Sequence, residues 1–219
     1  MVLPDGEPAV DEWRAVGKAE LVRLIEQAAP RPAGRPLVVA VDGRGAAGKS
    51  TLAGWLLEAV PASAVVHTDD LAWCEPFFAW GPSLQQLLRA LHRGGSVHQR
   101  PPAWETKGRS GAIDVPAGTE LVVVEGVGAS QREHAELIDV TVWVQSDFAE
   151  AERRGIVRDI ELGLNGDAEQ SVAFWHEWMA HELVFVQQQR PWERAALVVA
   201  GTVVIPLETD QLAVADGPL

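Results

Sequence analysis

Short apolar runs alternate with amphipathic segments along most of this chain. The runs are rich in valine and too short for buried helices, so we predict strands over residues 36–41, 64–68, 121–125, 140–144 and 196–205. Apolar positions recur at three- and four-residue intervals elsewhere, which predicts helices over residues 8–29, 49–59, 83–93, 131–137, 147–162 and 168–188. Buried strands that alternate with helices predict an α/β fold, with a parallel sheet covered by helices.

The same pattern divides the chain into three parts. Residues 1–33 are expected to form an N-terminal helix that packs on the core, because a proline-bounded linker ends this part. Residues 34–207 carry the strands and helices of one domain, and the weakly patterned residues 208–219 are expected to be a loosely held tail. The stretch 96–118 is predicted to be irregular, and its length favours a functional role.

A glycine-rich loop follows the first predicted strand. Residues 42–51 read DGRGAAGKST and contain the complete G-x-x-x-x-G-K-[ST] pattern, between a predicted strand and a predicted helix. In such a loop backbone N–H groups surround a phosphate chain, Lys49 reaches the terminal phosphates and the Ser50 hydroxyl binds Mg²⁺. The loop therefore predicts binding of ATP or GTP with Mg²⁺, through Gly43, Gly45, Ala46, Ala47, Gly48, Lys49, Ser50 and Thr51.

Acidic residues follow two further predicted strands. Asp69 and Asp70 come directly after residues 64–68, and Glu125 ends the strand 121–125. Ligands bind beyond the carboxyl ends of the strands in such sheets, so these carboxylates are expected near the phosphate loop. Asp69 is the candidate to accept the proton of an attacking hydroxyl, with Asp70 as the alternative, and Glu125 is the candidate for the Mg²⁺ site. Turn formation or helix capping is the other interpretation of the Asp pair.

Two arginines are spaced for one face of a helix. Arg154 and Arg158 lie four residues apart in the predicted helix 147–162, so together they can clamp phosphates. The alternative is a solvated face on which they pair with the neighbouring carboxylates Glu150, Glu152 and Asp159. Spacing alone does not separate these two interpretations.

Two other patterns fail inspection. His176, Glu177 and His181 miss the H-E-x-x-H zinc motif by one position, so a helix face is the better interpretation. The glycine pattern that begins at Gly126 lacks the third glycine of a dinucleotide fingerprint, because Gln131 stands there.

Taken in chain order, these motifs resemble the uridine kinase family of P-loop kinases. The resemblance spans residues 36–202 and rests on the phosphate loop, Thr68-Asp-Asp, Val124-Glu-Gly-Val and the run RRGIVRD at residues 153–159. It implies a P-loop NTPase fold: a five-stranded parallel sheet flanked by helices, with a helical lid over about residues 148–190. It also implies transfer of the ATP γ-phosphate to a nucleoside 5′-hydroxyl, with Asp69, Lys49, Arg154 and Arg158 as the catalytic candidates.

The acceptor half departs from that family's pattern. Where the family has an aromatic pair after the catalytic Asp, this chain has Leu71-Ala72-Trp73. Trp104 stands where the family has a tyrosine, and Arg109 falls near the position of the family's base-contacting histidine. The candidate substrate-binding residues are Asp70, Trp73, Phe77, Trp80, Trp104 and Arg109. The aromatic rings in this part of the chain either stack on a ring of the acceptor or pack within the lid. A pyrimidine nucleoside is the leading expectation for the acceptor, and a nucleotide, sugar, cofactor precursor or antibiotic is the alternative.

Composition narrows the range of partners. The net charge of −13 argues against nucleic acid, which needs a basic face. The apolar runs reach about half of the roughly 20 residues that span a membrane, and Cys74 is the only cysteine, so we expect a cytoplasmic protein. A nucleotide-binding regulator that takes no acceptor is the rival function, but such a protein has no need of an acceptor base at Asp69. The oligomeric state is left open.

Overall fold

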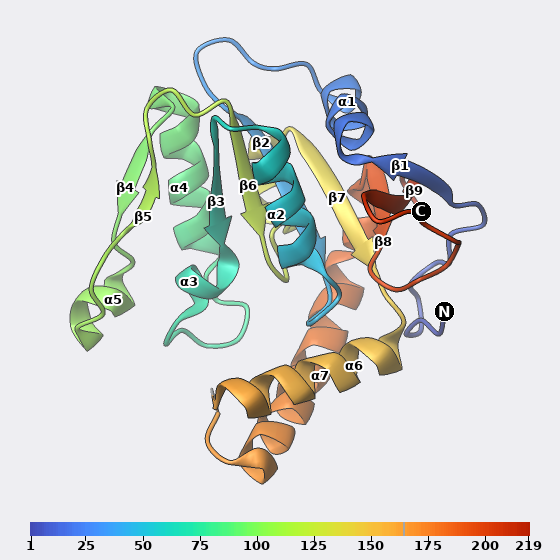
Figure 1. The fold of residues 1–219 in the computed structure, drawn as a ribbon. Helices are drawn as coiled ribbons and strands as arrows, with labels where there is room; N and C mark the ends of the chain where they lie inside the picture. Colours follow the sequence, from blue (N-terminus) through green and yellow to red (C-terminus); the bar gives the residue numbers. More distant parts are fainter. Residues whose placement is uncertain (164) are drawn as a thin grey trace.

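A seven-stranded sheet with the order β1-β9-β8-β7-β2-β6-β3 forms the centre of the computed structural model, which describes residues 1–163 and 165–219 (Figure 1). Five neighbouring strands run parallel: β8 (Leu197–Ala200), β7 (Val140–Gln145), β2 (Leu37–Gly43), β6 (Leu121–Glu125) and β3 (Ser63–His67). Every residue of β2, β6 and β7 is buried, which explains their continuous apolar runs. The expected α/β fold with five parallel strands is confirmed.

The edge of the sheet next to β8 differs from expectation. β9 (Gln211–Asp216) pairs antiparallel with β8, and β1 (Arg14–Gly17) pairs antiparallel with β9. The helix predicted over residues 8–29 is therefore wrong in its first half, since only α1 (Lys18–Ala28) is helical. The tail predicted from residue 208 is also wrong, because β9 is held in the sheet. Both errors have one cause: these short strands depend on partners distant in the sequence, which local periodicity does not report.

Helices cover both faces of the sheet, as Figure 1 shows. Alternate residues of β2 point to opposite faces, so Val39 packs with α1 and α2 (Lys49–Ala59), whereas Val38 packs with α4 (Gly81–Gly94). The short helix α3 (Thr68–Ala72) follows β3 directly. Two short 3₁₀ elements, η1 (Arg132–Leu137) and η2 (Pro191–Arg194), precede β7 and β8 and are not labelled in the figure. Among the described residues, no helix combines the length and apolar character needed to cross a bilayer.

The stretch 96–118 has more regular structure than predicted. It contains β4 (Val97–Gln99), α5 (Pro102–Lys107) and β5 (Ile113–Val115), and the two strands pair as a separate antiparallel sheet. Each of these elements is only a few residues long, which is too short to show a clear hydrophobic period. The stretch places Trp104 and Arg109 against α3, where both contact Asp70.

Two consecutive helices, α6 (Phe148–Leu162) and α7 (Ala168–Gln189), occupy the segment predicted to be a lid. In Figure 1, α6 and the first part of α7 lie beyond the end of the sheet at which β2 enters the loop before α2, and α7 then runs back toward the sheet, where Val186 packs with Trp143. Asp167 caps α7, because its carboxylate accepts from the Gln170 N–H while the Gln170 side chain accepts from the Asp167 N–H. The helices cross at Gly155, where a Cβ atom would lie 1.9 Å from the indole ring of Trp175.

An ion pair between Arg35 and Asp139 lies at the end of the sheet opposite the phosphate loop. Asp139 accepts two hydrogen bonds from the Arg35 guanidinium, at 2.7 and 2.8 Å, and one from the Val38 N–H at 2.8 Å. Burial alone raises the pKa of Asp139, but the bonds from Arg35 and Val38 outweigh it and lower the pKa below its ordinary value of 3.8. The stabilisation is therefore complete above about pH 4 and is lost as the pH falls through the lower folded-state pKa.

We expect Asp139→Asn to lower the free energy of unfolding by about 1–3 kcal/mol at pH 7, because a half-buried guanidinium loses its charged partner. Urea denaturation at pH 7 and pH 3 measures this effect. The difference between wild type and variant should be smaller at pH 3 than at pH 7, because below about pH 4 the carboxyl of the unfolded wild type takes up a proton, and the folded carboxyl follows at lower pH. A control is Asp114→Asn, whose exposed pair with His98 should contribute little at either pH.

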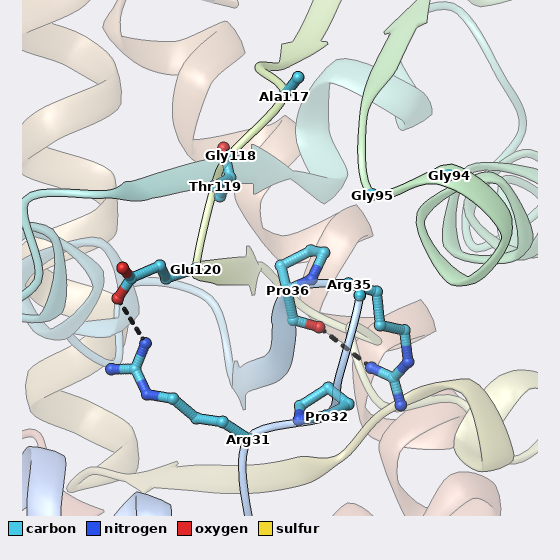
Figure 2. Close-up of a pocket in the computed structure, with 11 residues that line it drawn as sticks. Arg31, Pro32, Arg35, Pro36, Gly94, Gly95, Ala117, Gly118, Thr119 and Glu120 are labelled. Carbon is cyan, nitrogen blue, oxygen red and sulfur yellow. Dashed lines mark hydrogen bonds and ion pairs between the residues drawn. The ribbon is translucent and has the colours of Figure 1, made fainter.

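A pocket of about 430 Å³ lies at this same end of the sheet, before the first residues of β2 and β6 (Figure 2). Two arginines line it, and both already have partners. Arg31 pairs with Glu120 across the pocket, and Arg35 donates to the Pro36 carbonyl and to Asp139. The phosphate loop follows β2 at the other end, so this pocket is separate from the predicted site.

Candidate active site

The predicted phosphate loop connects β2 with α2, as its sequence requires. Gly48 has a φ of +105° directly before the first residue of α2, a conformation that glycine adopts without strain. Ala46 also has a positive φ, of 54°, without being a glycine. Lys49 is buried, whereas Ser50 and Thr51 are exposed in the first turn of α2. The loop thus places backbone N–H groups and a lysine at the positive end of a helix, where an anion binds favourably.

Asp42 braces this loop against the segment that follows β6. Its buried carboxylate accepts from the N–H groups of Gly43, Gly128 and Ser130, at 2.8, 2.9 and 2.9 Å, and from the Ser130 hydroxyl at 2.7 Å. Four donors satisfy the oxygens of this side chain, which compensates the cost of burying it. Asp42 was not among the predicted site residues, although it stands within the motif.

A hydrogen-bonded group of three side chains lies at the carboxyl ends of the strands. It consists of Ser50 in the first turn of α2, Glu125 at the end of β6 and His67 at the end of β3. Glu125 Oε1 lies 3.2 Å from the Ser50 hydroxyl, and Oε2 lies 2.7 Å from His67 Nδ1. Burial by itself raises the pKa of Glu125, but the bond to His67 and the charge of Lys49 outweigh it, so the pKa is lowered. The same bond raises the pKa of His67. His67 was not among the predicted site residues, because a lone histidine at a strand end gives no specific signal.

The predicted Mg²⁺ ligands have the right chemistry. Ser50 and Glu125 bring a hydroxyl and a carboxylate together, and Mg²⁺ prefers such oxygen ligands, usually one or two of them beside substrate phosphates. Within residues 1–163 and 165–219 there is no cluster of three or more His, Cys, Asp or Glu that could hold a metal without a substrate. Ser50 and Glu125 therefore fit an ion whose other ligands are nucleotide phosphates and water.

Asp69 lies in the first turn of α3, next to the end of β3. Its side chain is open to solvent, but enough protein surrounds it that desolvation raises the pKa of Asp69, against the opposing charge of Lys49. Close packing at Gly126 holds α3 to β6, because a Cβ atom there would lie 1.7 Å from the Thr68 hydroxyl oxygen. The structure therefore brings Asp69 near Lys49 and Glu125, as the strand-end argument predicts.

Four of the predicted acceptor residues also lie together. Arg109 pairs with Asp70 at 2.5 Å, and its guanidinium carbon lies 3.7 Å from the ring centroid of Trp104 and 5.4 Å from that of Trp73. The Trp104 indole N–H donates to the Asp70 carbonyl at 2.8 Å. Trp104 is nearly fully buried, so it supports Arg109, whereas Trp73 keeps part of its surface accessible. The group adjoins Asp69 through the chain of α3.

The other two predicted acceptor residues pack within the protein. Trp80 is 2% exposed in the core under α4, so it has no surface on which a ligand ring could lie. Phe77 is partly accessible and packs edge-on against Trp178, with ring centroids 5.2 Å apart, and against Phe174. For these two rings the packing interpretation from the sequence fits the structure. Phe77 joins the segment after α3 to the lid helix α7.

The two lid arginines have separate surroundings. Arg154 donates to the Gly201 carbonyl at 2.9 Å and to the Ser146 hydroxyl at 2.7 Å, so it is tied to the base of the lid. Arg158 is half exposed and pairs with its neighbour Asp159, while its charge acts on Asp69. A joint phosphate clamp stays a prediction, because the structure pairs both residues with protein groups.

Comparison with known proteins shows which solved structures share this fold. No protein-family model matches the chain, and no curated protein matches it. Among solved structures, it is similar to a protein provisionally named a fructose transport system kinase from Silicibacter sp. TM1040, with 24% identity, 72% of this chain and 87% of that chain covered, and a TM-score of 0.53. A possible uridine kinase from Bacillus stearothermophilus has 21% identity over 82% of this chain and 98% of that chain, with a TM-score of 0.48. The first likeness agrees with the motifs, and the chain has the P-loop NTPase fold that they imply.

Proposed function

We propose that the protein is a uridine kinase-like, Mg²⁺-dependent phosphotransferase that moves the γ-phosphate of ATP or GTP to a hydroxyl of a small molecule. One observation carries the proposal: Lys49, Ser50, Asp69 and Glu125 converge from three neighbouring parallel strands at one edge of the sheet. This set supplies each part that phosphoryl transfer needs from a protein. The names of the two similar proteins, both of which contain the word kinase, support the same reaction class.

Each residue has a defined task in this reaction. Lys49 and the loop N–H groups hold the phosphate chain of the nucleotide, and Ser50 and Glu125 hold its Mg²⁺ ion, which neutralises phosphate charge when bound. Asp69 takes the proton of the acceptor hydroxyl as its oxygen forms a bond to the γ-phosphorus and the bond to the nucleoside diphosphate breaks. The raised pKa of Asp69 makes it a better base than an ordinary aspartate. Arg158, and Arg154 after release from Gly201, would stabilise the transferred phosphate.

The surroundings of Arg109 support an uncharged acceptor. Its guanidinium already pairs with Asp70 and stacks on Trp104, and Arg100 donates to the Arg109 carbonyl. A phosphorylated acceptor would therefore compete with Asp70 for the arginine. A nucleoside or a sugar needs no such exchange, because its hydroxyls can bond to the Asp70 carboxylate while a ring face lies on Trp73. A pyrimidine nucleoside remains our first choice among these.

The location proposed for the enzyme is the cytoplasm. The net charge of −13 and the single, exposed Cys74 support a cytoplasmic enzyme that acts on small molecules.

A screen for acceptor-dependent consumption of ATP tests the proposal. The purified protein is incubated with ATP and Mg²⁺ alone, and then with nucleosides, nucleoside monophosphates and sugars, while formation of ADP is followed. We expect ADP only when one class of acceptor is present, and the phosphorylated acceptor should be detected by mass spectrometry. Slow ATP hydrolysis that no acceptor accelerates would instead support the nucleotide-binding regulator.

A further inference from the structure

Glu182 is a buried carboxylate that the proposed reaction leaves without a task. It belongs to the lid helix α7, is 2% exposed, and its Oε1 accepts from the Gly45 N–H of the phosphate loop at 2.6 Å. Its Oε2 lies 4.0 Å from Arg44 Nη1. Burial raises the pKa of Glu182, against the opposing effects of the Gly45 N–H, the charges of Arg44 and Lys49, and the Trp178 side chain. A carboxylate is costly to bury unless its contacts compensate, so the bond from the Gly45 N–H matters to this helix.

The contact is with the peptide group that also holds the nucleotide-binding lysine. Gly45 supplies the N–H of this peptide to Glu182, and Arg44 supplies its C=O to Lys49 Nζ at 2.8 Å. A peptide group is planar, so the orientation of its N–H fixes the orientation of its C=O. Glu182 on the lid and Lys49 in the nucleotide site are therefore joined through one rigid unit.

The surrounding packing keeps this peptide in place. A Cβ atom at Gly45 would lie 3.3 Å from Glu182 Oε1 and from the Trp175 ring, and 3.4 Å from Trp178 Nε1, so α7 lies directly on the loop. The Arg44 side chain is buried and pairs with Glu7 at 2.8 Å, while its Nη1 has no hydrogen-bond partner among the described residues. The first turn of the loop is thus enclosed by the lid on one side and the N-terminal segment on another.

We propose that Glu182 is a positioning residue that couples the lid to the phosphate loop through the Arg44–Gly45 peptide. It orients the Arg44 carbonyl, which in turn holds Lys49 where it meets the phosphates. A movement of α7 therefore changes the position of Lys49, and occupation of the loop changes the stability of α7. This coupling rests on the proposed function, since it assigns a task within the same nucleotide site.

Three variants test the coupling in the full-length protein. Glu182→Ala removes the acceptor, Glu182→Gln keeps an oxygen at the same place, and Glu177→Ala is the control on an exposed position of the same helix. Binding of inorganic tripolyphosphate with Mg²⁺ is measured by calorimetry. We expect E182A to bind about tenfold more weakly, as for loss of a hydrogen bond to a charged group. E182Q should recover to within about threefold of wild type, and E177A should equal it.

The outcomes separate the two proposals. Equal affinity of wild type and E182A overturns the coupling while leaving the nucleotide site intact. A wild-type protein that does not bind tripolyphosphate overturns the proposed nucleotide site together with the coupling that rests on it. Circular dichroism establishes that the variants are folded.

Hydrogen exchange tests the same coupling first in the wild-type protein, where the result does not depend on the folding of a variant, and then in the variants. Tripolyphosphate with Mg²⁺ should slow exchange in the part of α7 around residues 175–186. That slowing should be absent in E182A and present in E177A. Unchanged exchange of this segment in the wild type, at a concentration that saturates the loop, overturns the coupling.

Discussion

Replacing Asp69 with Asn is expected to lower turnover at least about a hundredfold, while the affinity for a non-hydrolysable ATP analogue changes by no more than about twofold. The substitution keeps the size and shape of the side chain but removes the group that accepts the hydroxyl proton. The contacts proposed for Lys49 and Ser50 with the nucleotide do not involve Asp69, so nucleotide binding should persist. Turnover is measured with the acceptor found in the screen, and affinity by calorimetry.

Glu75→Gln provides the matched control for this variant. Glu75 is an exposed acidic residue in the loop after α3, and its substitution removes the same charge a few residues away. Its turnover should stay within about twofold of wild type, because long-range electrostatic effects at the surface are screened. Near-normal turnover of Asp69→Asn would remove Asp69 from the role of base and leave Asp70 as the next candidate.

Gly155→Ala is expected to destabilise the lid even though alanine is the better helix former. The added methyl group would lie 1.9 Å from the ring of Trp175, which is 4% exposed and enclosed between α6 and the phosphate loop. Overpacking of this kind costs about 1–3 kcal/mol, and more where the neighbour cannot move. The helix gains about 1 kcal/mol from the loss of glycine. The clash should prevail because the indole is enclosed, with a net loss of up to about 2 kcal/mol in the free energy of unfolding.

Gly54→Ala is the internal comparison, because Gly54 lies in the interior of α2 with nothing within 4 Å of its added Cβ atom. Here only the propensity term acts, so the variant should be more stable by about 1 kcal/mol. Thermal unfolding should thus shift in opposite directions for the same chemical change. Gly155→Ala should also lower turnover, since displaced helices move Arg154 and Arg158. A stabilised Gly155→Ala protein would show that the two helices separate at no cost.

The positions of the phosphate loop, Asp69 and Glu125 in the fold can be predicted from the sequence, because the patterns that place them are short and contiguous. A phosphate loop is a contiguous motif, and strand-end residues such as Asp69 and Glu125 reach one edge once the sheet is parallel. The same argument cannot say what each side chain touches. Arg154 and Arg158 show this limit, because their spacing permits a clamp while the structure bonds Arg154 to Gly201 and Arg158 to Asp159.

The features that the sequence does not predict depend on contacts between distant segments. His67 has no local signal, and its meaning comes only from Glu125, a partner on another strand. Trp80 and Trp73 are both aromatic residues near the predicted site, and only the packing of α4 decides that Trp80 is in the core. Glu182 could have been noticed in the sequence. It lies on the same face of α7 as the buried residues Trp175 and Val186, where an acidic residue is unexpected.

The position of β9 has a consequence for the order in which the protein folds. β9 lies between β8 and β1, so within the described residues β1 is held in the sheet through residues 211–214 of β9. During synthesis the five parallel strands can associate before β9 leaves the ribosome, whereas β1 has no edge to join until then. The antiparallel edge of the sheet, formed by β9 and β1, is therefore expected to assemble after the five parallel strands.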